Sequence, residues 1–151
     1  MSNLLVQNIK HTNGTTAITV DSSAQMTVKS DGGATTTSLQ QGLGKAWINF
    51  NGSGTIATRD SFNISGNTDN GSGSYTPAYT NNFSNNDYAF NLSCCNFSSG
   101  NSTFVHHFWL GSDLLTTAQT QVNTLYVSNT SGGGSGADSD LIMVQFHGDL
   151  A

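Results

Sequence analysis

The side chains of this sequence that could do chemistry are nine Asp, four His and two adjacent cysteines, Cys94 and Cys95. Two facing carboxylates can hydrolyse a glycosidic bond, because one acts as an acid while the other acts as a base or nucleophile. Most of the Asp residues, however, stand in turn sequences such as Asp31-Gly32, where Asp is favoured by local hydrogen bonds. There is also no GxSxG motif to mark a nucleophilic serine. We therefore expect no catalytic residues, with an enzyme that cleaves host glycans as the alternative.

Metal and redox chemistry have equally weak support. A disulfide between Cys94 and Cys95 would be strained, and on a strand the two thiols would point to opposite faces, so we expect plain reduced cysteines. His106 and His107 would diverge in the same way. Three copies of one histidine, either of these or His147, could bind a metal around a symmetry axis, although ordinary packing is the simpler interpretation. We expect no metal and no cofactor.

The composition favours an all-β fold. Hydrophobic residues make up 35% of the chain and charged residues 9%, while Ser, Thr, Asn and Gly are abundant and Glu is absent. Long helices normally use Glu on their surfaces, whereas a polar, uncharged chain with Thr, Val, Ile and Phe suits short strands and turns. A net charge of −5 is too small to indicate disorder.

The same features exclude several functional classes. An acidic chain with only four Lys and Arg residues can neutralise few phosphate groups, so nucleic acid is not an expected partner. No apolar run is long enough to span a membrane, and the N-terminus has no basic region followed by a signal-length apolar segment. We expect a protein made in the cytoplasm, without membrane insertion.

The clearest element is a hairpin in residues 45–65, KAWINFNGSGTIATRDSFNIS. Apolar and polar positions alternate over 46–50, and the NGSG sequence at 51–54 is typical of a hairpin turn. The second extended run carries Arg59, the only arginine, beside Asp60. We expect these two residues to form a structural ion pair that links strands and does no chemistry.

Beyond the hairpin, turns recur at intervals typical of a sandwich or barrel. We expect 66–74 to be a loop, 112–120 a helical turn or loop, and 131–136 flexible. Pro77 indicates an edge position or a strand end. The remaining strands are expected at 75–79, 87–93, 104–110, 122–128 and 141–147. The sequence therefore predicts an antiparallel β-sandwich over 45–151, of jelly-roll or Greek-key type.

Residues 1–44 read as an N-terminal β-arm. Short strands are expected at 4–9, 17–20 and 26–28, followed by a Gly/Thr-rich linker at 31–44. So few apolar residues cannot build a core, and such an arm gains stability only by packing on something else. The residues expected to make these partner or trimer contacts are Leu4, Val6, Ile9, Ile18, Val20 and Val28.

The aromatic residues allow two interpretations. Trp47, Trp109 and the four Tyr residues could form a platform on which sugars stack, or they could be ordinary core residues. The core interpretation is the simpler one, and the platform stays open as the alternative.

Several segments together resemble the tail-fibre-like and virion appendage proteins of tailed bacteriophages, especially cyanobacterial and marine phages. In the arm the segment is VQNIKHTNGTTAITVDSSAQMTV, and in the β-domain the segments are KAWINFNGSGT, RDSFNIS, DNGSGSYT and FSNNDYAF, with LIMVQFHGDLA at the end. Two departures are the short region before the β-domain and Ala24, where such arms usually carry Gly, so that a different turn type is expected.

The resemblance implies a homotrimeric virion surface protein without enzymatic activity. Short length favours a capsid decoration, or cement, protein that stabilises the head shell. The alternative is a short tail fibre or receptor-binding adhesin that recognises the host cell surface. The implied partners are further copies of the chain, the major capsid protein or tail proteins of the same virion, and a host surface glycan.

Overall fold

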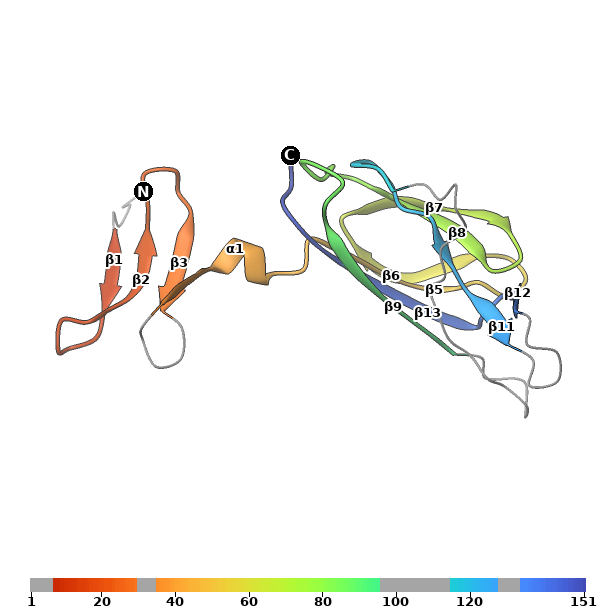
Figure 1. Ribbon diagram of the computed structural model, residues 1–151, viewed down its shortest axis with the longest axis horizontal. Helices are drawn as coiled ribbons and strands as arrows, with labels where there is room; N and C mark the ends of the chain where they lie inside the picture. Colours follow the sequence, from red (N-terminus) through yellow and green to blue (C-terminus); the bar gives the residue numbers. More distant parts are fainter. Residues whose placement is uncertain (1–6, 30–34, 96–114, 128–133) are drawn as a thin grey trace. The chain divides into compact units, whose positions relative to one another are not determined.

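The computed structural model describes residues 7–29, 35–95, 115–127 and 134–151. Within these ranges the regular structure is almost entirely antiparallel β-strand, with one helix of four residues, so the predicted all-β class is confirmed (Figure 1). The chain divides into two compact units, Met1–Leu43 and Gly44–Ala151. The expected strand at 104–110 and the beginning of 112–120 lie outside the described residues.

The first unit is a four-stranded antiparallel sheet in the order β1-β2-β3-β4, followed by a short helix. The second and third of these strands match the expected ones at 17–20 and 26–28 within a residue. The elements are β1 (Asn8–Lys10), β2 (Thr16–Val20), β3 (Met26–Lys29), β4 (Thr36–Ser38) and α1 (Leu39–Gly42).

The turn between β2 and β3 is organised by Asp21. Its side-chain Oδ1 accepts hydrogen bonds from the backbone N–H groups of Ser23 at 2.8 Å and Gln25 at 2.9 Å. Ala24 adopts a φ of +59°, the left-handed region that glycine occupies most easily. Ala24 therefore keeps the backbone conformation that a glycine would adopt at this position, because the Asp21 hydrogen bonds hold the turn.

The segment 31–44 is not simply a linker. Its described part contains β4, which pairs with β3, and α1, which begins after the N-cap Ser38. The Oγ of Ser38 accepts a hydrogen bond from the N–H of Gln41 at 3.3 Å. The sequence did not predict this strand because its residues are short and polar and show no alternation of apolar side chains. The backbone makes its pairing with β3.

The second unit contains a four-stranded sheet in the order β6-β5-β13-β9. The predicted hairpin is confirmed, because β5 (Ala46–Asn51) pairs antiparallel with β6 (Ala57–Phe62). The strand expected at 141–147 is confirmed as β13 (Leu141–His147), and the one expected at 87–93 is β9 (Ala89–Cys95), which begins and ends two residues later. In the turn of the β5–β6 hairpin, Gly52 packs so closely against Tyr75 that a Cβ at this position would collide with the tyrosine hydroxyl.

A three-stranded sheet in the order β10-β8-β7 forms the other large sheet of this unit. It comprises β7 (Ile64–Gly71), β8 (Ser74–Tyr79) and β10 (Val122–Asn123). The prediction of a loop at 66–74 is therefore wrong, because most of this segment belongs to β7. This strand is rich in Gly, Asn, Thr and Asp and pairs with β8 through its backbone. Pro77 lies in β8 between two strands, not at an edge, and its carbonyl accepts from the N–H of Thr120 at 3.2 Å.

The remaining pair is β11 (Leu125–Val127) with β12 (Gly134–Gly136). The expected strand at 122–128 is thus divided between two sheets, because β10 pairs with β8 while β11 pairs with β12. The described part of the segment expected to be flexible, 131–136, is the strand β12.

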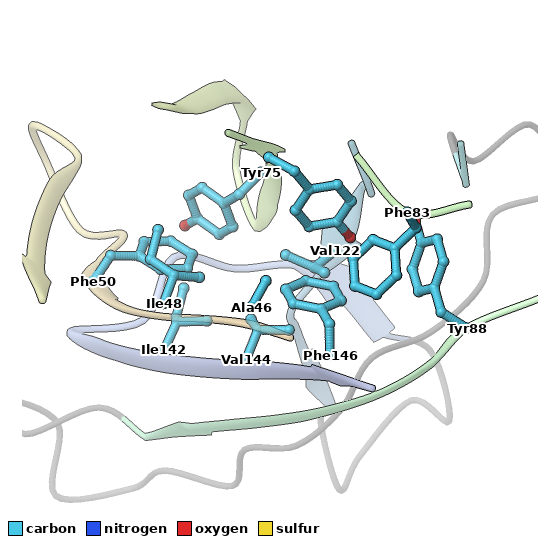
Figure 2. Packing of buried hydrophobic residues seen from close by; sticks show 11 residues of the cluster. Ala46, Ile48, Phe50, Tyr75, Phe83, Tyr88, Val122, Ile142, Val144 and Phe146 are labelled. Atoms are coloured by element: carbon cyan, nitrogen blue, oxygen red, sulfur yellow. The ribbon is translucent and has the colours of Figure 1, made fainter. Parts of the chain in front are cut away.

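The core lies between the two larger sheets of the second unit. Figure 2 shows the inward side chains of β5 and β13, such as Phe50 and Phe146, directed toward Tyr75 of β8 and its neighbours. Ring contacts join the sheets: the centroids of Phe50 and Tyr75 are 5.1 Å apart, and those of Tyr79 and Phe146 are 5.2 Å apart. Edge-to-face pairs of this kind add to the stabilisation from burial.

Candidate functional site

The apolar residues of the arm share one face of its sheet. Ile9 lies opposite Ile18, and Ile18 lies opposite Val28, so the three side chains form a row across three strands. Val20 lies two residues along β2 and opposite Met26. We call these five residues the arm face. It brings together four of the expected contact residues and adds Met26, which the sequence had not singled out.

The described residues place no buried core against the arm face. Among the described residues of the first unit none is buried, and Ile9 is 53% exposed. The core cluster of the chain is built from residues of the second unit alone, within the part that the structure describes. The other four residues of the arm face are half-buried, so the face is only partly removed from water. The described part of this sheet therefore has less burial than normally holds a small sheet together. Leu4 and Val6 lie outside the described residues.

A second surface lies on the outer side of the four-stranded sheet. Since Ile48 and Val144 point into the core, the residues that alternate with them point the opposite way. An open hollow of about 410 Å³ lies there. Its outward-facing lining residues are Trp47 and Asn49 of β5, Met143 and Gln145 of β13, and Asn91 and Ser93 of β9. We call it the outer hollow.

Strand register sets the lining of the outer hollow in two rows. Trp47 lies opposite Gln145, and Gln145 lies opposite Asn91. In the second row Met143 stands between Asn49 and Ser93 in the same way. The surface thus combines one aromatic ring, one thioether and neutral polar groups.

Asn49 carries an unusual feature within the outer hollow. Its side-chain Oδ1 is buried and has no hydrogen-bond partner among the described residues. The described residues contain two such asparagines, and the other, Asn67, lies on β7 of the opposite sheet. A buried polar atom without a partner costs free energy, and in native structures it calls for a bound water, ion or ligand as explanation.

The core interpretation of the aromatic residues is confirmed for three tyrosines and is wrong for Trp47. Tyr75, Tyr79 and Tyr88 are buried in the core, whereas Trp47 lies on the opposite side of its sheet. Burial raises the pKa of the Tyr75 hydroxyl, and its hydrogen bond to Asp138 raises it further. Burial likewise raises the pKa of Tyr79. Trp109 lies outside the described residues.

The expected Arg59–Asp60 ion pair is absent from the described part of the chain. Both residues are exposed, and Oδ1 of Asp60 accepts a hydrogen bond from the N–H of Ser61 at 2.8 Å. Consecutive residues of an extended strand point apart, and Arg59 falls at the register shift where β6 has one residue more than β5. Arg59 therefore marks a bulge at the sheet edge, not a link between strands.

Cys94 and Cys95 are free thiols at the end of β9. Cys94 packs against the core, while His147 is half-buried at the end of β13. Within the described ranges no three His, Cys or Asp side chains are grouped as metal ligands would be. The helix that the structure describes is too short to cross a membrane. His106 and His107 lie outside the described residues.

Comparison with known proteins provides no family for this chain. No family model, no curated protein and no solved structure matches it.

Proposed function

We propose that this chain is a non-enzymatic structural protein of a bacteriophage virion surface, assembled as a homotrimer. In this proposal it is a capsid decoration protein that stabilises the head shell and contacts the major capsid protein. The resemblance of the arm and β-domain segments to virion appendage proteins supports the location.

The observation that carries the assembly is the arm face. Five apolar residues gather on one side of a sheet in which no described residue is buried, and they include Ile18 and Val28 in direct opposition. Identical arms that pack together would remove this face from water, and a closed symmetric assembly is the usual way in which copies of one chain do so. The arm therefore acts as an assembly element.

For the second unit we propose a β-sandwich of jelly-roll or Greek-key type. The support is the contact between its two larger sheets, where Phe50 of β5 meets Tyr75 of β8 and Tyr79 of β8 meets Phe146 of β13. Such a compact domain, with its own core, suits a role as a rigid block on a particle surface.

A short tail fibre or receptor-binding adhesin is the second candidate function. The outer hollow is the specific observation that favours it, because a site of small-ligand size suits recognition of a group on the host surface. A cement protein needs only a surface that contacts the capsid. Copy number separates the two functions: a decoration protein is present in on the order of hundreds of copies per virion, and a fibre in a few dozen or fewer.

Two measurements test the proposal. Light scattering of the purified full chain should give three times the chain mass of 15.8 kDa. Quantitative mass spectrometry of purified virions should then find a copy number of the decoration class. A monomer at micromolar concentration would contradict the trimer, and absence from virions would contradict the virion role.

A further inference from the structure

We infer that the outer hollow is a binding site for a neutral saccharide. The inference depends on the second unit alone and does not require the virion location or the trimer. It concerns the face of the four-stranded sheet that is turned away from the core.

The hollow has the size and construction of a small-ligand site. Its volume of about 410 Å³ falls within the range of about 300–1,000 Å³ that is common for such sites. Its walls come from three adjacent strands, β5, β13 and β9, which are held in one sheet by continuous pairing. Side chains on a paired sheet are positioned more firmly than side chains on loops, so the lining is preorganised.

The lining chemistry matches a sugar ring. A pyranose has apolar C–H faces and a rim of hydroxyl groups, each of which donates and accepts hydrogen bonds. Trp47 and Met143 supply apolar surface for the faces. The amides of Asn91 and Gln145 supply both donors and acceptors for the rim, at fixed spacing on neighbouring strands.

Asn49 provides the second, independent indication of a ligand. Its buried Oδ1 lacks a donor within the described part of the chain, although the residue stands in the wall of the hollow. An unused acceptor of this kind costs stability in the free protein and gains a hydrogen bond when a hydroxyl group is bound. Because this oxygen is closed to solvent in the free protein, the Asn49 side chain must turn toward the hollow to expose it, and in that position we assign Asn49 as the acceptor for a ligand hydroxyl.

Charge decides between neutral and anionic saccharides. The residues that line the hollow carry no formal charge. Asp60 lies opposite Asn49 on the neighbouring strand β6, and the chain as a whole has a net charge of −5. An acidic sugar would be repelled by this field and would find no basic partner in the lining, so the ligand is a neutral one.

The experiment uses the full-length protein and affinity electrophoresis in gels that contain neutral polysaccharides, such as dextran or galactomannan, or anionic ones, such as alginate. The test variants are Trp47→Ala and Asn49→Ala. The matched control is Asn67→Ala, which removes the other buried amide without a partner from the opposite sheet. Thermal unfolding and light scattering are measured on each variant.

The expected result is retardation of the wild-type protein by at least one neutral polysaccharide. Trp47→Ala and Asn49→Ala should each weaken the apparent affinity about tenfold or more, and Asn67→Ala should leave it unchanged. Asn49→Ala should also unfold at the same temperature as the wild type or a higher one, because it removes an unsatisfied group. If Asn49 had only a structural role, Asn49→Ala would lower the unfolding temperature together with the affinity.

Three outcomes would overturn the inference. The first is no retardation by any neutral polysaccharide, or equal retardation of the wild type and Trp47→Ala. The second is retardation by the anionic polysaccharide alone. The third is a change of native mass in Trp47→Ala, which would identify the outer hollow as an interface between copies of the chain.

Discussion

The hydroxyl group of Tyr75 donates a hydrogen bond to Oδ1 of Asp138 over 2.9 Å, and this bond joins β8 to the segment that precedes β13. The same carboxylate oxygen accepts from the backbone N–H of Gly73 at 2.7 Å, in the turn between β7 and β8. One acidic side chain thus connects the segment before β13 to the start of β8 and the turn just before it, next to the core.

Removal of this carboxylate should destabilise the second unit. Asp138→Ala leaves the backbone N–H of Gly73 without its acceptor and leaves the Tyr75 hydroxyl with the Gly52 carbonyl, at 3.1 Å, as its acceptor. We expect a loss of about 2 kcal/mol in the free energy of unfolding. Urea unfolding followed by fluorescence measures it. The control is Asp87→Ala, at an exposed position outside the strands, which should change the value by less than about 0.5 kcal/mol. Equal effects of the two substitutions would show that Asp138 has no special role.

Alkaline pH should weaken the fold through the buried tyrosines. The pKa values of Tyr75 and Tyr79 are raised above the ordinary value of 10.0, so the folded state holds protons that the unfolded state releases. Their stabilising contribution is complete below about pH 10 and is lost as the pH rises above it, with a slope of about 1.4 kcal/mol per pH unit for each proton.

Urea unfolding between pH 9 and pH 11.5 tests this pH dependence. Tyr79→Phe keeps the ring packing against Phe146 but removes one of the two titrating hydroxyls, so the slope above pH 10 should become shallower. An unchanged slope in this variant would show that Tyr79 does not titrate with unfolding.

A charge on the arm face should prevent trimer formation. Ile18→Asp places a carboxylate in the middle of the row between Ile9 and Val28, and burial of that charge between subunits is unfavourable. Ala17→Asp is the matched control, because Ala17 is exposed on the other face of the same strand. Native mass from light scattering should fall to that of the monomer only in Ile18→Asp. A fall in both variants, or in neither, would contradict the assignment of the arm face.

Deletion of residues 1–30 should leave the second unit folded, since its core contains no residue of the arm within the described part of the chain. The truncated protein should unfold cooperatively and remain a monomer, and it should no longer associate with virions. Light scattering, together with a virion co-sedimentation assay, measures these properties. A truncated protein that still trimerises and docks would show that assembly lies in the second unit.

The residue between β6 and β7 should be among the most sensitive in the second unit. Asn63 has a φ of +57°, its Nδ2 donates to the carbonyls of Lys45 and Asn81, and its Oδ1 accepts from the N–H of Asn81 at 2.7 Å. We expect Asn63→Ala to cost about 2–4 kcal/mol through lost hydrogen bonds and backbone strain.

Asn63→Gly separates these two terms, because glycine tolerates the positive φ but makes none of the side-chain bonds. It should therefore destabilise the protein about 1 kcal/mol less than Asn63→Ala does. Equal effects of the two substitutions would show that the hydrogen bonds alone make the residue important.

The sequence by itself determined the elements whose pattern is local. Alternation in 46–50 identified β5, because one face of the strand is buried and the apolar residues recur at every second position. The strand expected at 141–147 is β13. The same logic located the apolar strands of the arm. It failed for β7, whose Gly, Asn and Asp residues carry no such period although its backbone pairs along most of β8.

Only the tertiary structure decided which residues share a surface. Trp47, Asn91 and Gln145 form one row of the outer hollow although they come from three distant parts of the chain. Strand order and register create that row, and a shift of one residue in any strand would turn its side chains to the other face. Local patterns cannot encode such a choice, because it is made by long-range backbone pairing and by the packing of the core beneath the sheet.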